Sequence, residues 1–209
     1  MATLYHYLDC PYCFKVRIYL HERQLPFDHA LIQRGSPPPE LSALNPLRRF
    51  PVWVTDEGKP IFGSNTIIDF LEQSGASTLL PTEPLHRARC WMADELARDG
   101  MLEPLLAMDR SMAGREPGDW DMDVYRKKTR RIRRSLDVLE ALLGGRQWLV
   151  GPEFSLADIA VTLPLTILER YGLDLTEHPG LADLRVRLDK RYSVVEARKD
   201  PSAKEATED

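Results

Sequence analysis

Two cysteines separated by two residues stand near the start of the chain, in the stretch DCPYCF at residues 9–14. A pair with this spacing can be a redox couple, half of a zinc site, or two packed thiols. Zinc needs about four ligands, and neither a second CxxC nor a nearby pair of histidines accompanies Cys10 and Cys13. These residues alone leave open a nucleophilic cysteine and simple packing.

The elements around the pair give the two cysteines different environments. Residues 2–8 are predicted to form a strand, and Pro11 suits the first turn of a helix that ends near Arg23 or Gln24. Cys10 then lies at a helix N-terminus, where free N–H groups and the helix dipole stabilise a thiolate. Cys13 lies one turn deeper, and a Cys10–Cys13 disulfide is sterically possible.

The next segments continue a small α/β unit. Residues 27–32 read as a second strand, which gives a βαβ unit with parallel pairing. Residues 51–54 and 60–62 are predicted to form a hairpin around a polar turn. Ser64 can cap a following helix with an apolar face. The predicted order is therefore βαβ followed by ββα.

The pattern is helical in the remainder of the chain. Residues 83–112 and 122–143 show helical spacing, and Ser155–Asp158 resembles a capping box before a helix that is apolar on nearly all sides. A last helix is predicted from about Pro179 to Arg191. We therefore expect an α/β domain at residues 1–75 and an all-helical domain at residues 84–195.

Composition limits the possible partners and location. The chain has 209 residues and a formal net charge of −4, so it is not built to coat nucleic acid or an acidic membrane. It has no apolar run near the ~20 residues of a membrane span, and no signal peptide is expected. Three cysteines do not form a disulfide framework, which favours a reducing cytoplasm.

A basic run at residues 126–134 contains seven lysines and arginines in nine residues. We interpret it first as a solvated helix face, paired in part with the aspartates just upstream. An anionic second substrate, an acidic protein or nucleic acid are the alternatives.

Four segments, taken in order, resemble the glutathione transferase superfamily. They are LYHYLDCPYCFKVRIYL, the stretch Asn45–Val52 with NPLRRFPV, the stretch FGSNTII from Phe62, and WLVGPEFSLADI from Trp148. The resemblance covers nearly the whole chain. It implies a thioredoxin-like N-terminal domain followed by a helical domain, with glutathione as the cofactor and a homodimer as the assembly.

The resemblance also implies a set of site residues. The CPYC sequence is similar to that of glutaredoxins and of cysteine-type transferases (omega, beta and dehydroascorbate reductase-like), in which the first cysteine forms a mixed disulfide with glutathione. Cys10 is then the nucleophile, with Cys13 as its possible partner. The segment before a cis Pro51 presents the Phe50 backbone to the cysteinyl part of glutathione, and Arg49 can meet the glycyl carboxylate.

Ser64 and the N-terminus of its helix suit the γ-glutamyl carboxylate. The family usually has Glu or Asp immediately before this serine, but this chain has Gly63, so the usual partner of the glutathione ammonium is missing. Phe14 completes the implied binding site. The predicted catalytic residues are Cys10 and Cys13, the predicted binding residues are Cys10, Phe14, Arg49, Phe50, Pro51, Gly63 and Ser64, and no metal site is predicted.

The function expected from these residues is that of a glutathione-dependent thiol transferase or reductase. Its second substrate would be a small electrophile or a disulfide. One alternative is a conjugating transferase or dehalogenase that does not need Cys10 as the nucleophile. Another is a non-catalytic binding protein that uses the same fold and the basic helix.

Overall fold

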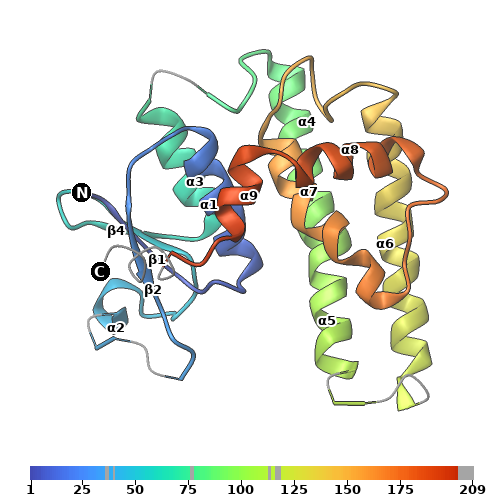
Figure 1. Cartoon of the computed structure of the whole chain (residues 1–209), viewed down its shortest axis with the longest axis horizontal. Coiled ribbons are helices and arrows are strands. Elements are labelled where there is room, and N and C mark those ends of the chain that lie inside the picture. The colour runs from blue at the N-terminus through green and yellow to red at the C-terminus, as the bar shows by residue number, and fades with distance from the viewer. Residues whose placement is uncertain (36–37, 40, 76–77, 113, 116–118, 202–209) are drawn as a thin grey trace. The chain divides into compact units, whose positions relative to one another are not determined.

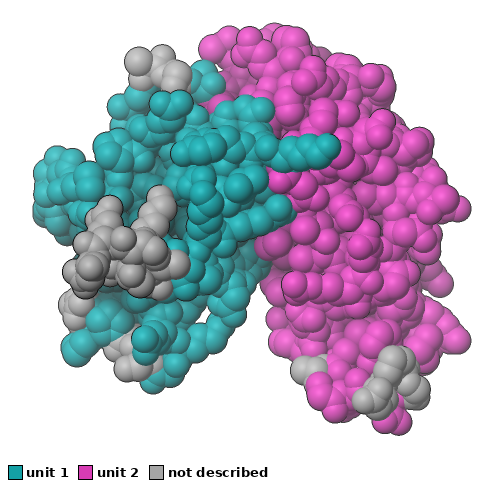
Figure 2. All heavy atoms as spheres, in the orientation of Figure 1, with its two compact units in different colours: residues 1–78, 190–209 teal, residues 79–189 magenta. Residues whose placement is uncertain are grey.

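The computed structural model describes residues 1–35, 38–39, 41–75, 78–112, 114–115 and 119–201. The chain forms two compact units, one of residues 1–78 together with 190–209 and the other of residues 79–189 (Figure 2).

The first unit is built on a four-stranded sheet in the order β2-β1-β3-β4 (Figure 1). β1 pairs in parallel with β2 and antiparallel with β3, and β3 pairs antiparallel with β4. This confirms the predicted thioredoxin-like order of βαβ followed by ββα. The elements are β1 (Thr3–His6), α1 (Pro11–Glu22), β2 (Asp28–Leu31), α2 (Leu41–Leu44), β3 (Val52–Val54), β4 (Pro60–Phe62) and α3 (Ser64–Gln73).

Helix α3 begins one residue earlier than the sequence predicts. Gly63 is the N-cap and Ser64 is the first helical residue, so the prediction of Ser64 as the cap is wrong. Gly63 has φ 93 and ψ 126, a backbone conformation open to glycine but costly for residues with a Cβ. The conformation at residue 63 thus decides where the helix starts.

The second unit is helical in its described part. Helix α4 continues through a π-helical segment, Leu96–Leu102, into α5, and a nearly buried helix, α7, contacts both α4 and α8. This confirms the predicted all-helical C-terminal fold. No helix in the described ranges has the length and apolar character that crossing a membrane requires. The helices are α4 (Pro84–Glu95), α5 (Glu103–Met112), α6 (Met122–Leu143), α7 (Leu156–Ile167) and α8 (Pro179–Asp189).

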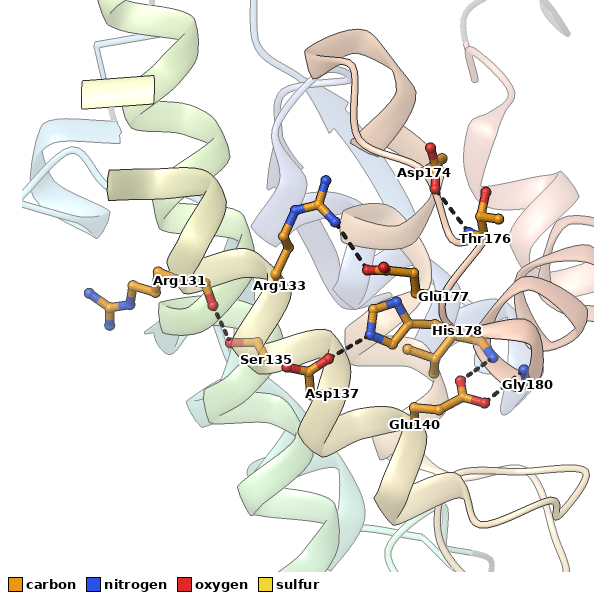
Figure 3. Close-up of polar contacts among 11 residues, drawn as sticks. Arg131, Arg133, Ser135, Asp137, Glu140, Asp174, Thr176, Glu177, His178 and Gly180 are labelled. Atoms are coloured by element: carbon orange, nitrogen blue, oxygen red, sulfur yellow. Dashed lines mark hydrogen bonds and ion pairs between the residues drawn. The ribbon is translucent and has the colours of Figure 1, made fainter. Parts of the chain in front are cut away.

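Polar side chains of α6 hold the start of α8 (Figure 3). The two carboxylate oxygens of Glu140 accept the backbone N–H groups of Gly180 and Leu181, each at 2.9 Å. Asp137 accepts from Nε2 of the buried His178 at 2.9 Å. The Glu140 carboxylate thus satisfies N–H groups that the first turn of α8 would otherwise leave without a partner.

A short final helix, α9 (Tyr192–Arg198), belongs to the first unit and packs on α1. The sequence pattern predicts one last helix that ends near Arg191, whereas the structure has two helices, with α8 ending at Asp189 and α9 beginning at Tyr192. Two contacts fix α9. Glu22 of α1 accepts from Arg191 Nε at 2.8 Å and from Ser193 Oγ at 2.7 Å, and Val194 and Ala197 are fully buried.

Candidate active site

Cys10 occupies the N-cap position of α1. Its backbone is extended, with φ −80 and ψ 121, and Pro11 follows as the first helical residue. The Cys13 backbone N–H donates to Cys10 Sγ at 3.4 Å, so the thiol takes the place of a capping oxygen. Cys10 is half-buried, Cys13 is fully buried, and both are free thiols.

The two thiols have opposite acidities. The pKa of Cys10 falls to about 7, because the Cys13 side chain hydrogen-bonds to it, backbone N–H groups of the first turn point at it, and Arg17 adds a positive charge, although burial opposes them. Burial, followed by the adjoining Cys10, raises the pKa of Cys13 far above its ordinary value. At neutral pH, Cys10 is therefore ionised in about half of the molecules, while Cys13 stays a thiol.

The register of the strands brings most of the predicted site residues to one end of the sheet. Tyr5 pairs with Val52, and Val52 pairs with Phe62. The C-terminal end of β1, the start of β3 and the C-terminal end of β4 therefore lie at the same end of the sheet. Cys10 follows the first of these ends and the Phe50–Pro51 segment precedes the second.

The contacts beyond the paired strands continue this arrangement. The rings of Tyr7 and Phe50 meet at 4.5 Å, and the Phe50–Pro51 peptide bond is cis, as the resemblance implies. The Pro51 carbonyl accepts the Gly63 N–H at 3.2 Å. The predicted Pro51 and Gly63–Ser64 segments are thus joined directly.

The N-terminus of α3 lies at the same end of the sheet, directly after β4. Ser64 and Asn65 are half-buried, and the Asn65 side chain accepts from Lys15 Nζ of α1 at 2.6 Å. A helix N-terminus with a lysine beside it is suited to a carboxylate. Sequence reasoning did not include Lys15, which the helical pattern alone could not place beside α3.

Two predicted binding residues lie apart from this arrangement or contribute little surface to it. Phe14 is 6% exposed, and the Arg17 guanidinium lies 5.7 Å from the centre of its ring. Arg49 is exposed, and its carbonyl accepts from the side chain of the buried Asn45. Phe14 therefore packs mainly inside the unit, while Arg49 is free to reach a ligand at the surface.

A buried arginine beneath the cysteines was missed by the sequence analysis. Arg17 is 2% exposed and lies one helical turn beyond Cys13. It contacts His6, which is fully buried and whose pKa falls to about 3 through burial and then the charge of Arg17. The signal was present in the sequence, because Arg17 stands on the apolar face of α1 among Cys13, Val16 and Leu20.

The basic run forms the outer face of α6. Six of its seven basic residues are exposed, and the seventh, Lys128, is half-buried. Arg126 pairs with Asp123 at 3.6 Å. Arg133 pairs with Glu177 at 3.3 Å (Figure 3). Both pairs are solvent-exposed, as a solvated helix face requires.

The described residues contain no group of three or more His, Cys, Asp or Glu side chains that could hold a metal ion.

Comparison with known proteins identifies the fold family. Residues 4–78 match the glutathione S-transferase N-terminal domain, and residues 102–191 match the glutathione S-transferase C-terminal domain. Maleylacetoacetate isomerase of Pseudomonas aeruginosa is 30% identical over 185 residues, covering 85% of this chain and 86% of that protein. This chain belongs to the glutathione S-transferase family.

Two further proteins are similar to this chain. FtsZ-localized protein A of Caulobacter vibrioides is 28% identical over 81% of this chain and 78% of that protein. A glutathione S-transferase structure from Methylobacillus flagellatus has a TM-score of 0.83 and 27% identity, and covers 96% of this chain and all of that one. That protein was crystallised with glutathione bound.

Proposed function

We propose that the protein is a glutathione-dependent thiol transferase in which Cys10 is the nucleophile. The observation that carries this proposal is the half-buried Cys10 thiol at the N-cap of α1, whose pKa of about 7 gives a large thiolate fraction at neutral pH. A thiolate of this acidity is close to the optimum for attack on disulfides. The family provides the second support, since a related structure holds glutathione.

The residues at this end of the sheet offer partners for some of the charged groups of glutathione. The N-terminus of α3 offers N–H groups and the Ser64 hydroxyl to the γ-glutamyl carboxylate, with Lys15 alongside. The exposed Arg49 offers a cation for the glycyl carboxylate. Gly63 offers no carboxylate to the ammonium, which predicts weaker binding than in relatives with an acidic residue there.

The reaction follows from the two acidities. Cys10 thiolate attacks the glutathione sulfur of a glutathionylated substrate, forming a Cys10–glutathione disulfide as the substrate's thiolate leaves and takes a proton. A second glutathione thiolate then attacks that disulfide, which releases oxidised glutathione and restores the Cys10 thiolate. Cys13 is an alternative resolving thiol, but burial and its raised pKa disfavour this step.

Intact mass after incubation with oxidised glutathione tests the proposal. We expect one added glutathione, mapped to Cys10 by peptide analysis and removed by reductant. A Cys10→Ser variant is the control and should gain no mass. An unmodified wild-type protein, or an adduct on Cys90 instead, would contradict the proposal.

Position 63 gives a second prediction. Gly63→Ala should lower the free energy of unfolding by about 1–2 kcal/mol, because alanine must adopt a positive φ. A Cβ would meet only Thr66 Oγ1 at 3.5 Å, so strain and not space is the obstacle. Gly63→Glu carries the same strain but adds the missing carboxylate.

We therefore expect Gly63→Glu to bind glutathione about tenfold more tightly than Gly63→Ala in calorimetry, since one charge-assisted hydrogen bond is regained. Gly63→Gln is the matched control without the charge. Equal affinities of all three variants would show that the ammonium is held by another group.

A second candidate is glutathione-dependent isomerisation or conjugation, favoured by the relative named maleylacetoacetate isomerase. In that case glutathione itself supplies the attacking thiolate and Cys10 acts as a hydrogen-bonding group. Activity with maleylacetoacetate or a chloro-dinitrobenzene substrate that survives Cys10→Ser would favour it. The homodimer and the cytoplasmic location remain predictions.

A further inference from the structure

Arg17 lies at the centre of a buried polar network that the proposed reaction does not use. Its guanidinium makes four hydrogen bonds, and all acceptors are neutral. Nη1 donates to the Tyr7 carbonyl at 3.1 Å and to His6 Nδ1 at 3.0 Å, Nη2 donates to the Leu8 carbonyl at 2.9 Å, and Nε donates to the Ala197 carbonyl at 2.9 Å.

The network fixes the protonation of His6. Because a guanidinium can only donate, His6 must accept through Nδ1, and its proton then lies on Nε2. That N–H can donate to His29 Nδ1 at 3.2 Å. With a pKa of about 3, His6 stays neutral and adds no second cation beside Arg17.

No carboxylate forms an ion pair with Arg17 within the described ranges, although the side chain is 2% exposed. A buried charge without a counterion is costly. Among the described residues, the charges that favour the protonated guanidinium are those of the two thiols and Asp9. Asp9 itself is exposed and paired with Arg34 at 3.0 Å.

The same hydrogen bonds shape the loop that carries the thiol. Arg17 binds the carbonyls of Tyr7 and Leu8, and the Cys10 N–H also donates to the Tyr7 carbonyl at 3.5 Å. Arg17 is held in turn by the Ala197 carbonyl near the end of α9. The negative end of that helix dipole suits a cation.

We infer that Arg17 is a positioning residue for Cys10. Its guanidinium binds the carbonyls of Tyr7 and Leu8 and places a permanent positive charge near the Cys10 thiol. The Ala197 carbonyl of α9 holds Arg17 in this position. The last helix of the chain thereby becomes part of the support of a cysteine near its start. This inference rests on the proposed role of Cys10 as nucleophile.

Other ionisable groups near Cys10 and Arg17 also affect the local charge. Cys13 hydrogen-bonds to Cys10 from α1, and His6 and His29 lie on β1 and β2. Asp9 and Arg34 form an exposed pair, and Asp200, beyond α9, acts weakly on His6. Cys13 acts on Cys10 through a hydrogen bond and brings no positive charge. The exposed pair is screened by solvent and His6 is neutral, so neither supplies the positive charge of the guanidinium.

The test is the pH profile of Cys10 alkylation by iodoacetamide in the full chain, with the Cys10 peptide quantified by mass spectrometry. Arg17→Met should raise the midpoint by about one pH unit, which slows alkylation at pH 7 about fivefold. Arg17→Lys keeps the charge but loses the fork of donors, and should recover part of the shift.

Arg23→Met is the matched control. Arg23 is a second buried arginine associated with α1, but it pairs with Glu72 at 3.2 Å and with the Tyr19 hydroxyl. Its loss should lower the melting temperature without moving the alkylation midpoint. A folded Arg17→Met variant with an unchanged midpoint, or an equal shift in Arg23→Met, would overturn the inference.

Glu22→Gln tests the anchor without touching Arg17, and serves if Arg17→Met fails to fold. It weakens the contacts to Arg191 and Ser193, so hydrogen exchange in α9 should rise and the midpoint should move upward. Simple removal of a negative charge would move it downward. Faster exchange in α9 with an unmoved or lowered midpoint would refute the anchoring.

Alkylation needs no glutathione, so the two proposals can fail separately. A wild-type midpoint near 7 that shifts in Arg17→Met, in a protein that gains no glutathione mass, would leave the inference standing and remove the proposed function. A glutathione adduct on Cys10 with no shift in Arg17→Met would do the reverse.

Discussion

Serine at position 10 is expected to reduce thiol transfer by about 10³-fold or more, the scale seen when a nucleophile is removed. A serine hydroxyl does not ionise near neutral pH, so the hydrogen bonds that stabilise the Cys10 thiolate have no anion to act on. The measurement is the reduction of hydroxyethyl disulfide and of dehydroascorbate with glutathione as the reductant. In the wild type, the rate should rise with pH through a midpoint near 7.

Cys13→Ser is the matched control for this prediction. Because Cys13 is fully buried and burial raises its pKa, we expect a second glutathione, and not Cys13, to resolve the mixed disulfide. The variant should therefore keep its activity within about tenfold. Its midpoint should stay close to that of the wild type, because the serine hydroxyl can still donate the hydrogen bond that is the main cause of the lowered pKa of Cys10. An inactive Cys13→Ser variant would establish a two-cysteine mechanism.

Undiminished thiol transfer in Cys10→Ser would remove Cys10 from the chemistry altogether. In that case the conjugating or isomerising alternative, with glutathione as the attacking thiol, would take its place. Folding of each variant is checked by its melting temperature, because Cys13 belongs to the core of the first unit.

Replacing Asp158 by asparagine is expected to lower the free energy of unfolding of the helical unit by about 3–4 kcal/mol. Asp158 is fully buried, and its two oxygens accept from Leu149 N at 2.9 Å, Ser155 N at 2.9 Å and Ser155 Oγ at 3.1 Å. Asparagine keeps one acceptor oxygen and turns an amide N–H₂ group toward a donor. At least one buried N–H then loses its partner.

Urea unfolding at pH 7.5, followed by the helical signal, checks this prediction. Burial raises the pKa of Asp158 to about 6, so the carboxylate is ionised under these conditions. Asp123→Asn is the control, because Asp123 also lies in a first helical turn but is exposed and forms only a surface pair. Its change should stay within about 0.5 kcal/mol. Equal effects at both positions would mean that the capping box adds little.

Local signals were sufficient for much of the fold. Pro11 predicted the start of α1, and its end near Arg23 is confirmed. The hairpin at residues 51–62 and the capping box at Asp158 are also present. Each depends on residues close in sequence, where turn chemistry and capping act directly.

Long-range partners were the part that sequence could not supply. The junction of α8 and α9 was missed because the pattern through Lys190 does not say which unit a seven-residue helix will cover. The helical pattern around Arg17 does not predict its buried partner, the carbonyl of Ala197, which lies 180 positions away in the sequence. The assignments of Cys10, Ser64 and the other site residues remain predictions that the experiments above decide.

The divided first unit also has a consequence for synthesis. Translation delivers residues 1–78 first, but the carbonyl of Ala197 that holds Arg17 leaves the ribosome only after the whole helical unit has been made. Domains generally fold as units while the chain emerges. During synthesis, the α/β segment of residues 1–78 therefore lacks the Ala197 carbonyl that binds Arg17. The helical unit, which lies between the two parts of the first unit in the sequence, can fold before the first unit is complete.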